Sequence, residues 1–214
     1  MTTAYRIVQH QARLYAHAVT SSPENALQLD VLLEAAKPAQ LEDEWHPLIA
    51  TPFRYSIPVE ARFEARFKPP ESNIRVLYSS ELVGTALYEH AYYFMLERID
   101  LAPEDENGSR TLFSLFVNEK KITDITKHPR IKELTDRKNY FGSHEHIRKH
   151  PNIKAVKYPS CRDPESGKNF AVFDIRLLGK NIGEERAIGF VFRAKNRSLF
   201  WVEAGLKINW SEVN

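Results

Sequence analysis

The chain of 214 residues is poor in cysteine, methionine and glycine. With Cys161 as its one cysteine, an intramolecular disulfide and a cysteine metal cluster are both excluded. The eight glycines form neither a G-x-G-x-x-G nor a G-x-x-x-x-G-K-[ST] arrangement, so the phosphate loops of Rossmann and P-loop proteins are missing. No apolar run is long enough to span a bilayer, and the N-terminus lacks an apolar signal segment. We therefore expect a cytoplasmic protein that does not contact a membrane.

An excess of charge of one sign is also lacking. Lys and Arg number 30 against 28 Asp and Glu, a net charge of +2. A balance this even gives no reason to expect direct binding of nucleic acid. The 43% of hydrophobic residues, with 12 Phe and nine Tyr, are enough for one substantial, aromatic-rich core.

A first helix is predicted shortly after residue 20. Ser21 or Ser22 can cap it, Pro23 suits its first turn, and Glu24 lies where the helix dipole favours an anion. Leucine and valine recur along one face of this segment. We interpret residues 1–50 as an N-terminal helical extension packed on the core, and residues 51–214 as the main domain.

A second helix is predicted after a short strand at residues 74–78. Ser79 or Ser80 can cap this helix, and its apolar residues between 82 and 96 cover most of its circumference. A helix of this kind is expected to be buried. Glu89 lies on one of its apolar faces.

Strands dominate the second half of the chain. Segments rich in Phe, Val, Ile and Leu lie at residues 110–117, 156–160, 170–177, 187–193 and 199–208. Residues 123–150 are predicted to be helical or irregular. Helices first and strands mostly later indicate an α+β single domain, with mixed β-sheets flanked by helices.

Glu89 is a carboxylate on an otherwise apolar helical face, which costs free energy unless the charge is paired or hydrogen-bonded. The pattern slightly favours a structural ion pair with Arg54, Arg62 or Arg66. The alternative is a cleft carboxylate that faces an electron-poor carbon of a substrate.

The same three arginines lie among aromatic residues upstream of the predicted buried helix. A guanidinium suits phosphate or pyrophosphate because its planar fork matches two oxygens at once. Alternatively, these side chains extend along apolar surface with only their charged ends in water, and the pattern alone favours that interpretation.

Ser160 ends a predicted strand, where it is either a site residue or an ordinary turn former. It lies in no G-x-S-x-G elbow, so serine-hydrolase chemistry is not expected. His144, His146 and His150 cluster without an H-E-x-x-H arrangement, which favours a solvated helical face over a metal site. Cys161 is expected to be an ordinary buried thiol.

Five segments, taken in order, resemble the RES-domain family, which is named for an arginine, a glutamate and a serine. They are Leu-Ile-Ala-Thr-Pro-Phe-Arg-Tyr at 48–55, Ala-Arg-Phe at 65–67, Leu-Tyr-Ser-Ser-Glu at 77–81, Thr-Ala-Leu-Tyr-Glu-His-Ala-Tyr-Tyr-Phe at 85–94 and Tyr-Pro-Ser-Cys-Arg-Asp-Pro at 158–164. The resemblance extends from about residue 5 to about residue 176.

The resemblance assigns the family glutamate to Glu89, a tyrosine to Tyr78 and the serine to Ser160. Two Ala-Arg-Phe copies compete for the arginine, and Arg66 fits the spacing to Tyr78 better than Arg62 does. Further candidates for binding the substrate are Arg54, Arg62, Arg162 and Asn169.

The resemblance also implies a fold similar to ADP-ribosyltransferase toxins and an enzyme that consumes NAD⁺ as its substrate, without a metal. Such proteins split the nicotinamide–ribose bond, with phosphate, water or a protein side chain as acceptor. They are toxins of type II toxin–antitoxin systems, and the expected partners are NAD⁺, inorganic phosphate and an Xre-like antitoxin protein. A protein ADP-ribosyltransferase and a catalytically silent binding protein remain alternatives, and a homodimer is compatible with the sequence.

The residues suit this reaction because cleavage of an N-glycosidic bond develops positive charge on the ribose. A fixed carboxylate in a dry pocket stabilises that charge, which is the role expected for Glu89. Arg66 is expected to hold the pyrophosphate or an attacking phosphate. Tyr78 is expected to stack on nicotinamide or bond the ribose, and Ser160 to orient the ribose or a phosphate.

Overall fold

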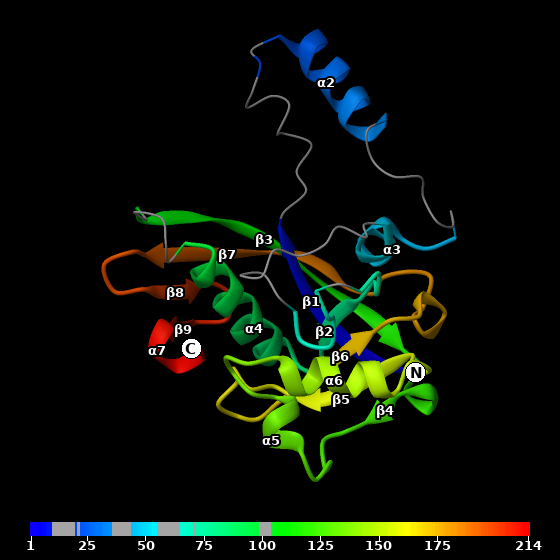
Figure 1. The fold of residues 1–214 in the computed structure, drawn as a ribbon. Coiled ribbons are helices and arrows are strands. Elements are labelled where there is room, and N and C mark those ends of the chain that lie inside the picture. The colour runs from blue at the N-terminus through cyan, green and yellow to red at the C-terminus, as the bar shows by residue number, and fades with distance from the viewer. Residues whose placement is uncertain (10–19, 21, 36–43, 55–64, 71, 99–103) are drawn as a thin grey trace.

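Nine strands form one sheet in the described part of the chain (Figure 1). They are β1 (Thr2–Gln9), β2 (Leu77–Ser80), β3 (Glu106–Val117), β4 (Thr123–Asp124), β5 (Ala155–Pro159), β6 (Lys168–Val172), β7 (Glu185–Arg193), β8 (Ser198–Trp201) and β9 (Leu206–Asn209). Their order is β4-β5-β6-β2-β1-β3-β7-β8-β9. The computed structural model describes residues 1–9, 20, 22–35, 44–54, 65–70, 72–98 and 104–214.

All neighbouring strands are antiparallel except β4 and β5, which run parallel, so the sheet is mixed. The helices are α2 (Pro23–Ala35), α3 (Pro47–Arg54), α4 (Val83–Leu96), α5 (Ile131–Leu134), α6 (Phe141–Lys149) and α7 (Trp210–Val213), with short 3₁₀ turns η2 (Glu119–Lys121) and η3 (Ile175–Leu177). This arrangement confirms the predicted α+β class. None of the described helices has the length and apolar character that crossing a membrane requires.

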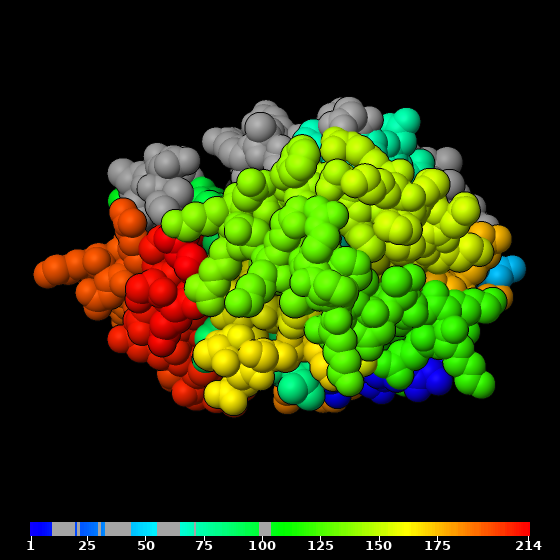
Figure 2. All heavy atoms as spheres, turned by 60° about the horizontal axis from the view of Figure 1, so that its bottom comes forward, coloured from blue at the N-terminus to red at the C-terminus, as the bar shows by residue number. Residues whose placement is uncertain are grey.

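The two faces of the sheet carry different helices, because successive side chains of a strand point to opposite sides. Leu112 of β3 packs with α4, whereas its neighbour Phe113 packs with Ile49 and Phe53 of α3. A third apolar cluster joins α5 and α6 to β5 and β6. Figure 2 shows this region from below, where light-green and yellow residues cover the surface beside the red C-terminal residues.

The interpretation of residues 1–50 as a purely helical extension is wrong in one respect. Thr2–Gln9 form β1, which lies between β2 and β3 in the middle of the sheet. The strand pairs with β3 over its full length, from Thr2↔Val117 to Gln9↔Arg110. Because its partner is about a hundred positions away in the chain, this pairing leaves no local sequence signal.

The first predicted helix is confirmed as α2. Its N-cap is Ser22, whose hydroxyl accepts a hydrogen bond from the backbone N–H of Asn25. The apolar face that was expected to pack on the core does not do so, because Leu27 is 67% and Val31 61% exposed.

The second predicted helix is confirmed as α4, but the strand before it, β2, begins and ends later than the expected 74–78. Ser79 and Ser80 pair with Phe170 and Asn169 in the β2–β6 ladder and therefore belong to β2. Leu82 takes the N-cap position, without a side-chain hydrogen bond. Backbone pairing in the sheet has thus displaced the predicted serine cap.

Two predicted strands are divided in the structure. The segment 199–208 forms a hairpin of β8 and β9, whose turn contains Gly205 at φ 59°, in the left-handed region that glycine tolerates best. The segment 170–177 leaves the sheet after Val172 and ends in η3. The short helices α5 and α6 agree with the prediction for residues 123–150.

Substitution of two phenylalanines of β3 tests which residues of this strand stabilise the core. Phe113 is fully buried, whereas Phe116 is 38% exposed. We expect Phe113→Ala to lower the free energy of unfolding by about 3–5 kcal/mol, because it removes a core ring and leaves a cavity. Phe116→Ala is the matched control, and urea denaturation measures both. Equal losses for the two variants would contradict this assignment of the core.

Candidate active site

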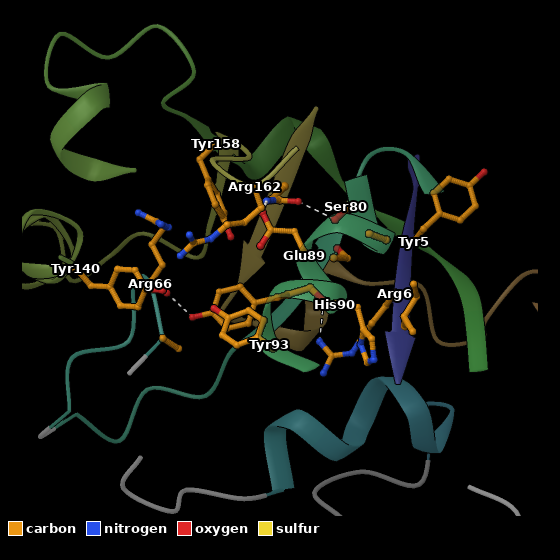
Figure 3. Close-up of a pocket in the computed structure, with 16 residues that line it drawn as sticks. Tyr5, Arg6, Arg66, Ser80, Glu89, His90, Tyr93, Tyr140, Tyr158 and Arg162 are labelled. Atoms are coloured by element: carbon orange, nitrogen blue, oxygen red, sulfur yellow. Dashed lines mark hydrogen bonds between the residues drawn. The ribbon is translucent and has the colours of Figure 1, made fainter. Parts of the chain in front are cut away.

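A cavity of about 290 Å³ lies between α4 and the strands β1, β2, β5 and β6 (Figure 3). On one side, β1 and β2 share a single registered pair, Tyr5↔Ser80, whereas β2 and β6 share four. The lining residues are Tyr5, Arg6, Ile7, Ala65, Arg66, Tyr78, Ser79, Ser80, Ala86, Glu89, His90, Tyr93, Tyr140, Tyr158, Arg162 and Asn169. Tyrosines and arginines thus dominate a hollow that contains one carboxylate.

Glu89 reaches this cavity from α4, and two neutral donors hold it. Its Oε1 accepts hydrogen bonds from Ser160 Oγ and from Asn169 Nδ2, each at 2.6 Å. Ser80 Oγ donates to Asn169 Oδ1 at 2.7 Å, which turns the amide nitrogen toward Glu89. The other carboxylate oxygen, Oε2, has no hydrogen-bond partner among the described residues, and the residue lines the cavity.

The structural ion pair that the pattern favoured for Glu89 is not present with Arg54 or Arg66. Within the described ranges no ion pair includes Glu89, and its partners are the neutral side chains of Ser160 and Asn169. Arg62 lies outside the described residues. Glu89 is therefore solvated by hydrogen bonds rather than by an opposite charge.

Ser160 is fixed by the loop that follows β5. Its hydroxyl oxygen accepts from the backbone N–H groups of Arg162 and Asp163, each at 3.1 Å, while its hydrogen goes to Glu89. Ser160 therefore positions the carboxylate, and its one donor is already used.

Asp163 ties the same loop to the start of α4. Its Oδ2 accepts from Thr85 Oγ1 at 2.6 Å and from the backbone N–H of Gly167 at 3.2 Å. A Cβ at position 167 would lie 1.9 Å from Thr85 Oγ1, so only glycine fits there.

Arg66 lies at the end of the cavity formed by Tyr140 and Tyr158 (Figure 3). Its Nη1 donates to the carbonyl of Leu134 at 3.0 Å, and its Nη2 donates to that of Asp136 at 2.8 Å. Its guanidinium carbon is 4.8 Å from the centre of the Tyr140 ring. Backbone carbonyls thus accept some of the hydrogen bonds that this guanidinium can donate, while its positive charge remains beside the cavity.

Tyr78 lines the cavity from β2, and its hydroxyl donates to the carbonyl of Arg66. Burial raises the pKa of the Tyr78 phenol well above its usual range, so the group stays protonated at neutral pH. Its ring, rather than its committed hydroxyl, is the part that a ligand can contact.

The other predicted binding residues are placed differently. Arg162 is 2% exposed, and although it lines the cavity it donates to the carbonyls of Val213 and Arg137, each at 2.6 Å. Its guanidinium carbon lies 3.5 Å from the centre of the Tyr92 ring. Arg54 ends α3 and does not line this cavity.

Arg6 and His90 are two cavity residues that sequence reasoning missed. Arg6 extends from β1, and its Nη1 donates to the carbonyl of Tyr78 at 2.7 Å. Burial lowers the pKa of Arg6 to about 10, so the guanidinium remains charged at neutral pH. The available signal was an arginine inside the short apolar run that begins at Tyr5.

His90 follows Glu89 on α4 and lies at the same end of the cavity as Arg6 (Figure 3). Burial, followed by the charges of Arg110, Arg6 and Arg98, lowers the pKa of His90 to about 3. The imidazole is therefore neutral at physiological pH.

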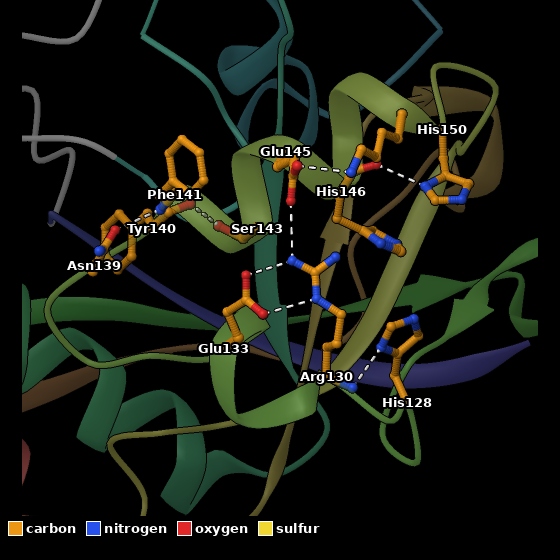
Figure 4. A network of polar contacts seen from close by, with 11 residues as sticks. His128, Arg130, Glu133, Asn139, Tyr140, Phe141, Ser143, Glu145, His146 and His150 are labelled. Carbon is orange, nitrogen blue, oxygen red and sulfur yellow. Dashed lines mark hydrogen bonds and ion pairs between the residues drawn. The ribbon is translucent and has the colours of Figure 1, made fainter.

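The predicted histidine cluster lies elsewhere, on and near α6 (Figure 4). The ring centres of His146 and His150 are 4.5 Å apart, and that of His128 is 5.5 Å from His146. Beside them Arg130 bridges Glu133 and Glu145. No group of three potential metal ligands is found in the described ranges.

His144 and Cys161 are both in structural contacts. Ring nitrogen Nε2 of His144, a buried residue, lies 3.1 Å from the carbonyl oxygen of Ala65. Cys161 Sγ accepts from Arg66 Nη2 at 3.1 Å, and burial raises the pKa of its thiol. A raised pKa keeps this sulfur in its weakly nucleophilic thiol form.

The comparison with protein families gives one match. A family model described as the RES domain matches residues 35–185, which include Arg66, Tyr78, Glu89 and Ser160. β1 with Arg6 precedes the matched range. No curated protein sequence matches the chain.

The contacts of Arg162 predict a role in holding the C-terminal residues against the loop of Ser160. We expect Arg162→Met to lower the free energy of unfolding by about 3 kcal/mol, because a buried carbonyl and a part-buried one lose their donor. The control is Arg186→Met, whose side chain is 53% exposed. Chemical denaturation measures both variants, and equal stabilities would show that the buried contacts of Arg162 contribute nothing.

Proposed function

Because the chain belongs to the RES-domain family, we propose that it is an enzyme that consumes NAD⁺ by breaking the bond between nicotinamide and ribose. RES domains are associated with enzymes that act on NAD. The observation that carries the proposal is the carboxylate of Glu89, which lines the cavity with Oε1 fixed by Ser160 and Asn169 and with no hydrogen bond to Oε2 among the described residues.

The charge changes of the reaction match this carboxylate. As the bond between ribose C1′ and the ring nitrogen breaks, its electron pair stays with nicotinamide, which leaves as a neutral molecule. Positive charge then develops on the ribose, and Oε2 of Glu89 stabilises it. The acceptor, which is phosphate, water or a protein side chain, bonds to C1′ and loses its proton.

The surroundings of Glu89 strengthen this stabilisation. Tyr78, Tyr93, Tyr140 and Tyr158 line the cavity, and their rings limit the water around the carboxylate. A charge interaction is several-fold stronger in such surroundings than in bulk water. The two donors on Oε1 hold the group in place before the substrate arrives, so little reorganisation is needed during the reaction.

The other residues take roles that follow from their contacts. Arg66 supplies positive charge for the pyrophosphate or for an attacking phosphate. Tyr78 offers its ring for stacking. Ser160 and Asn169 act through Glu89, since both already donate to its Oε1, and this differs from the ribose contact expected for Ser160.

We further propose that the chain is the toxin of a type II toxin–antitoxin pair, with an Xre-like protein as its antitoxin. Loss of NAD⁺ stops growth, so expression of the chain in bacteria should arrest growth and lower cellular NAD⁺. An antitoxin that covers the cavity would prevent both effects.

Incubation of the purified protein with NAD⁺ tests the reaction and identifies the acceptor. Nicotinamide that appears only when phosphate is added indicates phosphorolysis, and phosphate-independent release indicates hydrolysis. Transfer of label from NAD⁺ to protein indicates ADP-ribosylation. A folded, antitoxin-free sample that releases no nicotinamide would contradict the proposal and leave a binding protein.

Glu89→Gln tests the catalytic group, because it keeps the shape of the side chain and removes its charge. We expect the rate of NAD⁺ loss to fall about 100- to 1,000-fold, with the fold retained. Glu97→Gln changes a carboxylate that is 60% exposed just after the same helix and should leave the rate unchanged. Nicotinamide release by chromatography gives the rates, and circular dichroism reports the fold. Full activity in Glu89→Gln would remove Glu89 from the mechanism.

A further inference from the structure

The buried polar atoms without partners are concentrated at the candidate active site. Six buried side-chain nitrogen or oxygen atoms have no hydrogen-bond partner in the described part of the chain. Half of them belong to residues that line the cavity: Arg6 Nε, Ser79 Oγ and His90 Nε2. Proteins normally satisfy such atoms, and each one left alone costs about 1–3 kcal/mol. A shared location indicates that a ligand supplies the missing partners.

The hydrogen-bonding character of His90 follows from its surroundings. A hydrogen bond to the backbone of Ile7 raises the pKa of the His90 ring. Only a bond in which the ring donates has this effect, so the Ile7 carbonyl is the acceptor. Because Nε2 has no partner, this contact belongs to Nδ1. In the neutral ring Nδ1 therefore carries the hydrogen, and Nε2 presents a lone pair that can only accept.

Arg6, at the same end of the cavity, has a donor that lacks an acceptor. Its Nη1 is held by the carbonyl of Tyr78, so the guanidinium is fixed while its Nε–H lacks an acceptor. Arg6 and His90 come from β1 and α4, and both labelled side chains lie at one end of the pocket (Figure 3). A donor and an acceptor without partners therefore both belong to residues that line this cavity.

We propose that Arg6 and His90 together recognise an amide-type edge of the substrate, in which an acceptor atom stands beside an N–H donor. Arg6 Nε–H donates to the acceptor atom, and the ligand's N–H donates to His90 Nε2. The inference rests on the proposed function in that NAD⁺ is the ligand, but it does not require cleavage.

Two parts of NAD⁺ carry such an edge. They are the carboxamide of nicotinamide and the N1–C6–N6 edge of adenine. A phosphate fits less well, because its oxygens would meet the lone pair of Nε2 rather than a hydrogen. The cavity of about 290 Å³ is at the lower limit for small-molecule sites, so one end of it has room for one ring of the dinucleotide.

Binding measurements in the Glu89→Gln background separate recognition from turnover. Isothermal titration compares NAD⁺ with two analogues, one with a methyl group in place of the carboxamide nitrogen and one with purine, which lacks the 6-amino group, in place of adenine. We expect the parent to bind one analogue about 10-fold more weakly than NAD⁺, because its N–H donor is lost. The analogue that is discriminated against identifies the ring at this end.

His90→Phe keeps a ring of similar size and removes both nitrogens, so it should abolish the discrimination between NAD⁺ and that analogue. His90→Gln places an amide near the position of Nε2 and should restore part of it. His146→Phe is the matched control, since His146 also has a buried, unpartnered Nε2 but lies outside the cavity. It should leave the ratio unchanged.

Nitrogen-15 NMR of the imidazole provides an independent readout. In the ligand-free protein Nε2 should show the shift of an unprotonated ring nitrogen, and it should move toward a hydrogen-bonded value when NAD⁺ binds. An unchanged analogue ratio in folded His90→Phe would overturn the proposal, as would a parent that binds both analogues as tightly as NAD⁺. Inorganic phosphate binding that only His90→Phe weakens would instead identify an oxyanion site and also overturn it.

The two proposals fail in different ways. If the protein discriminates between the analogues through His90 but never releases nicotinamide, the recognition inference stands and the proposed reaction is wrong. If nicotinamide is released while His90→Phe discriminates like its parent, the reaction stands and the inference is wrong.

Discussion

The candidate site depends on one constraint, which is the solvation of a carboxylate on an otherwise apolar helix. Glu89 has no ion-pair partner in the described part of the chain, so its charge is balanced by hydrogen bonds from Ser160 and Asn169. Each of those donors needs support of its own. Ser160 is held by two backbone N–H groups of its loop, and that loop is tied through Asp163 to Thr85 on the same helix as Glu89. The contacts form a closed circuit from α4 through the loop and back to α4, so the carboxylate is fixed without an arginine that would neutralise it.

The sheet supplies the space beside this carboxylate. Where β1 and β2 share only the pair Tyr5↔Ser80, side chains rather than ladder hydrogen bonds fill the region between the strands. Arg6 donates to the carbonyl of Tyr78 there, so an arginine side chain satisfies a backbone acceptor of the neighbouring strand. The same departure from regular pairing also brings a cation to the cavity.

Sequence reasoning found the parts of the site that carry local signals. Glu89 stands out on an apolar helix, Ser160 and Asn169 flank a turn, and the resemblance placed Tyr78 and Arg66 in order. The fold class and the helices α2 and α4 were also predictable from caps and periodicity. Arg6 was missed because β1 becomes a central strand only through pairing with β3, about a hundred positions away. The serine cap of α4 was predicted wrongly for a related reason, since Ser79 and Ser80 pair with β6 and are strand residues.

The two ends of the cavity differ in how completely their polar atoms are satisfied. Around Arg66, Tyr78 and Ser160 most donors already have protein acceptors, so that end is rigid and its charges are fixed in place. Around Arg6 and His90 a donor and an acceptor lack partners. A ligand that gains hydrogen bonds at only one end is oriented by that end, because reversing it would leave the polar atoms of Arg6 and His90 unsatisfied. In the proposed reaction this orientation matters for Glu89, because its Oε2 would stabilise charge on the ribose only if the ribose lay beside it. The unsatisfied end would thus set the position of the substrate, and the satisfied end would act on the bond that breaks.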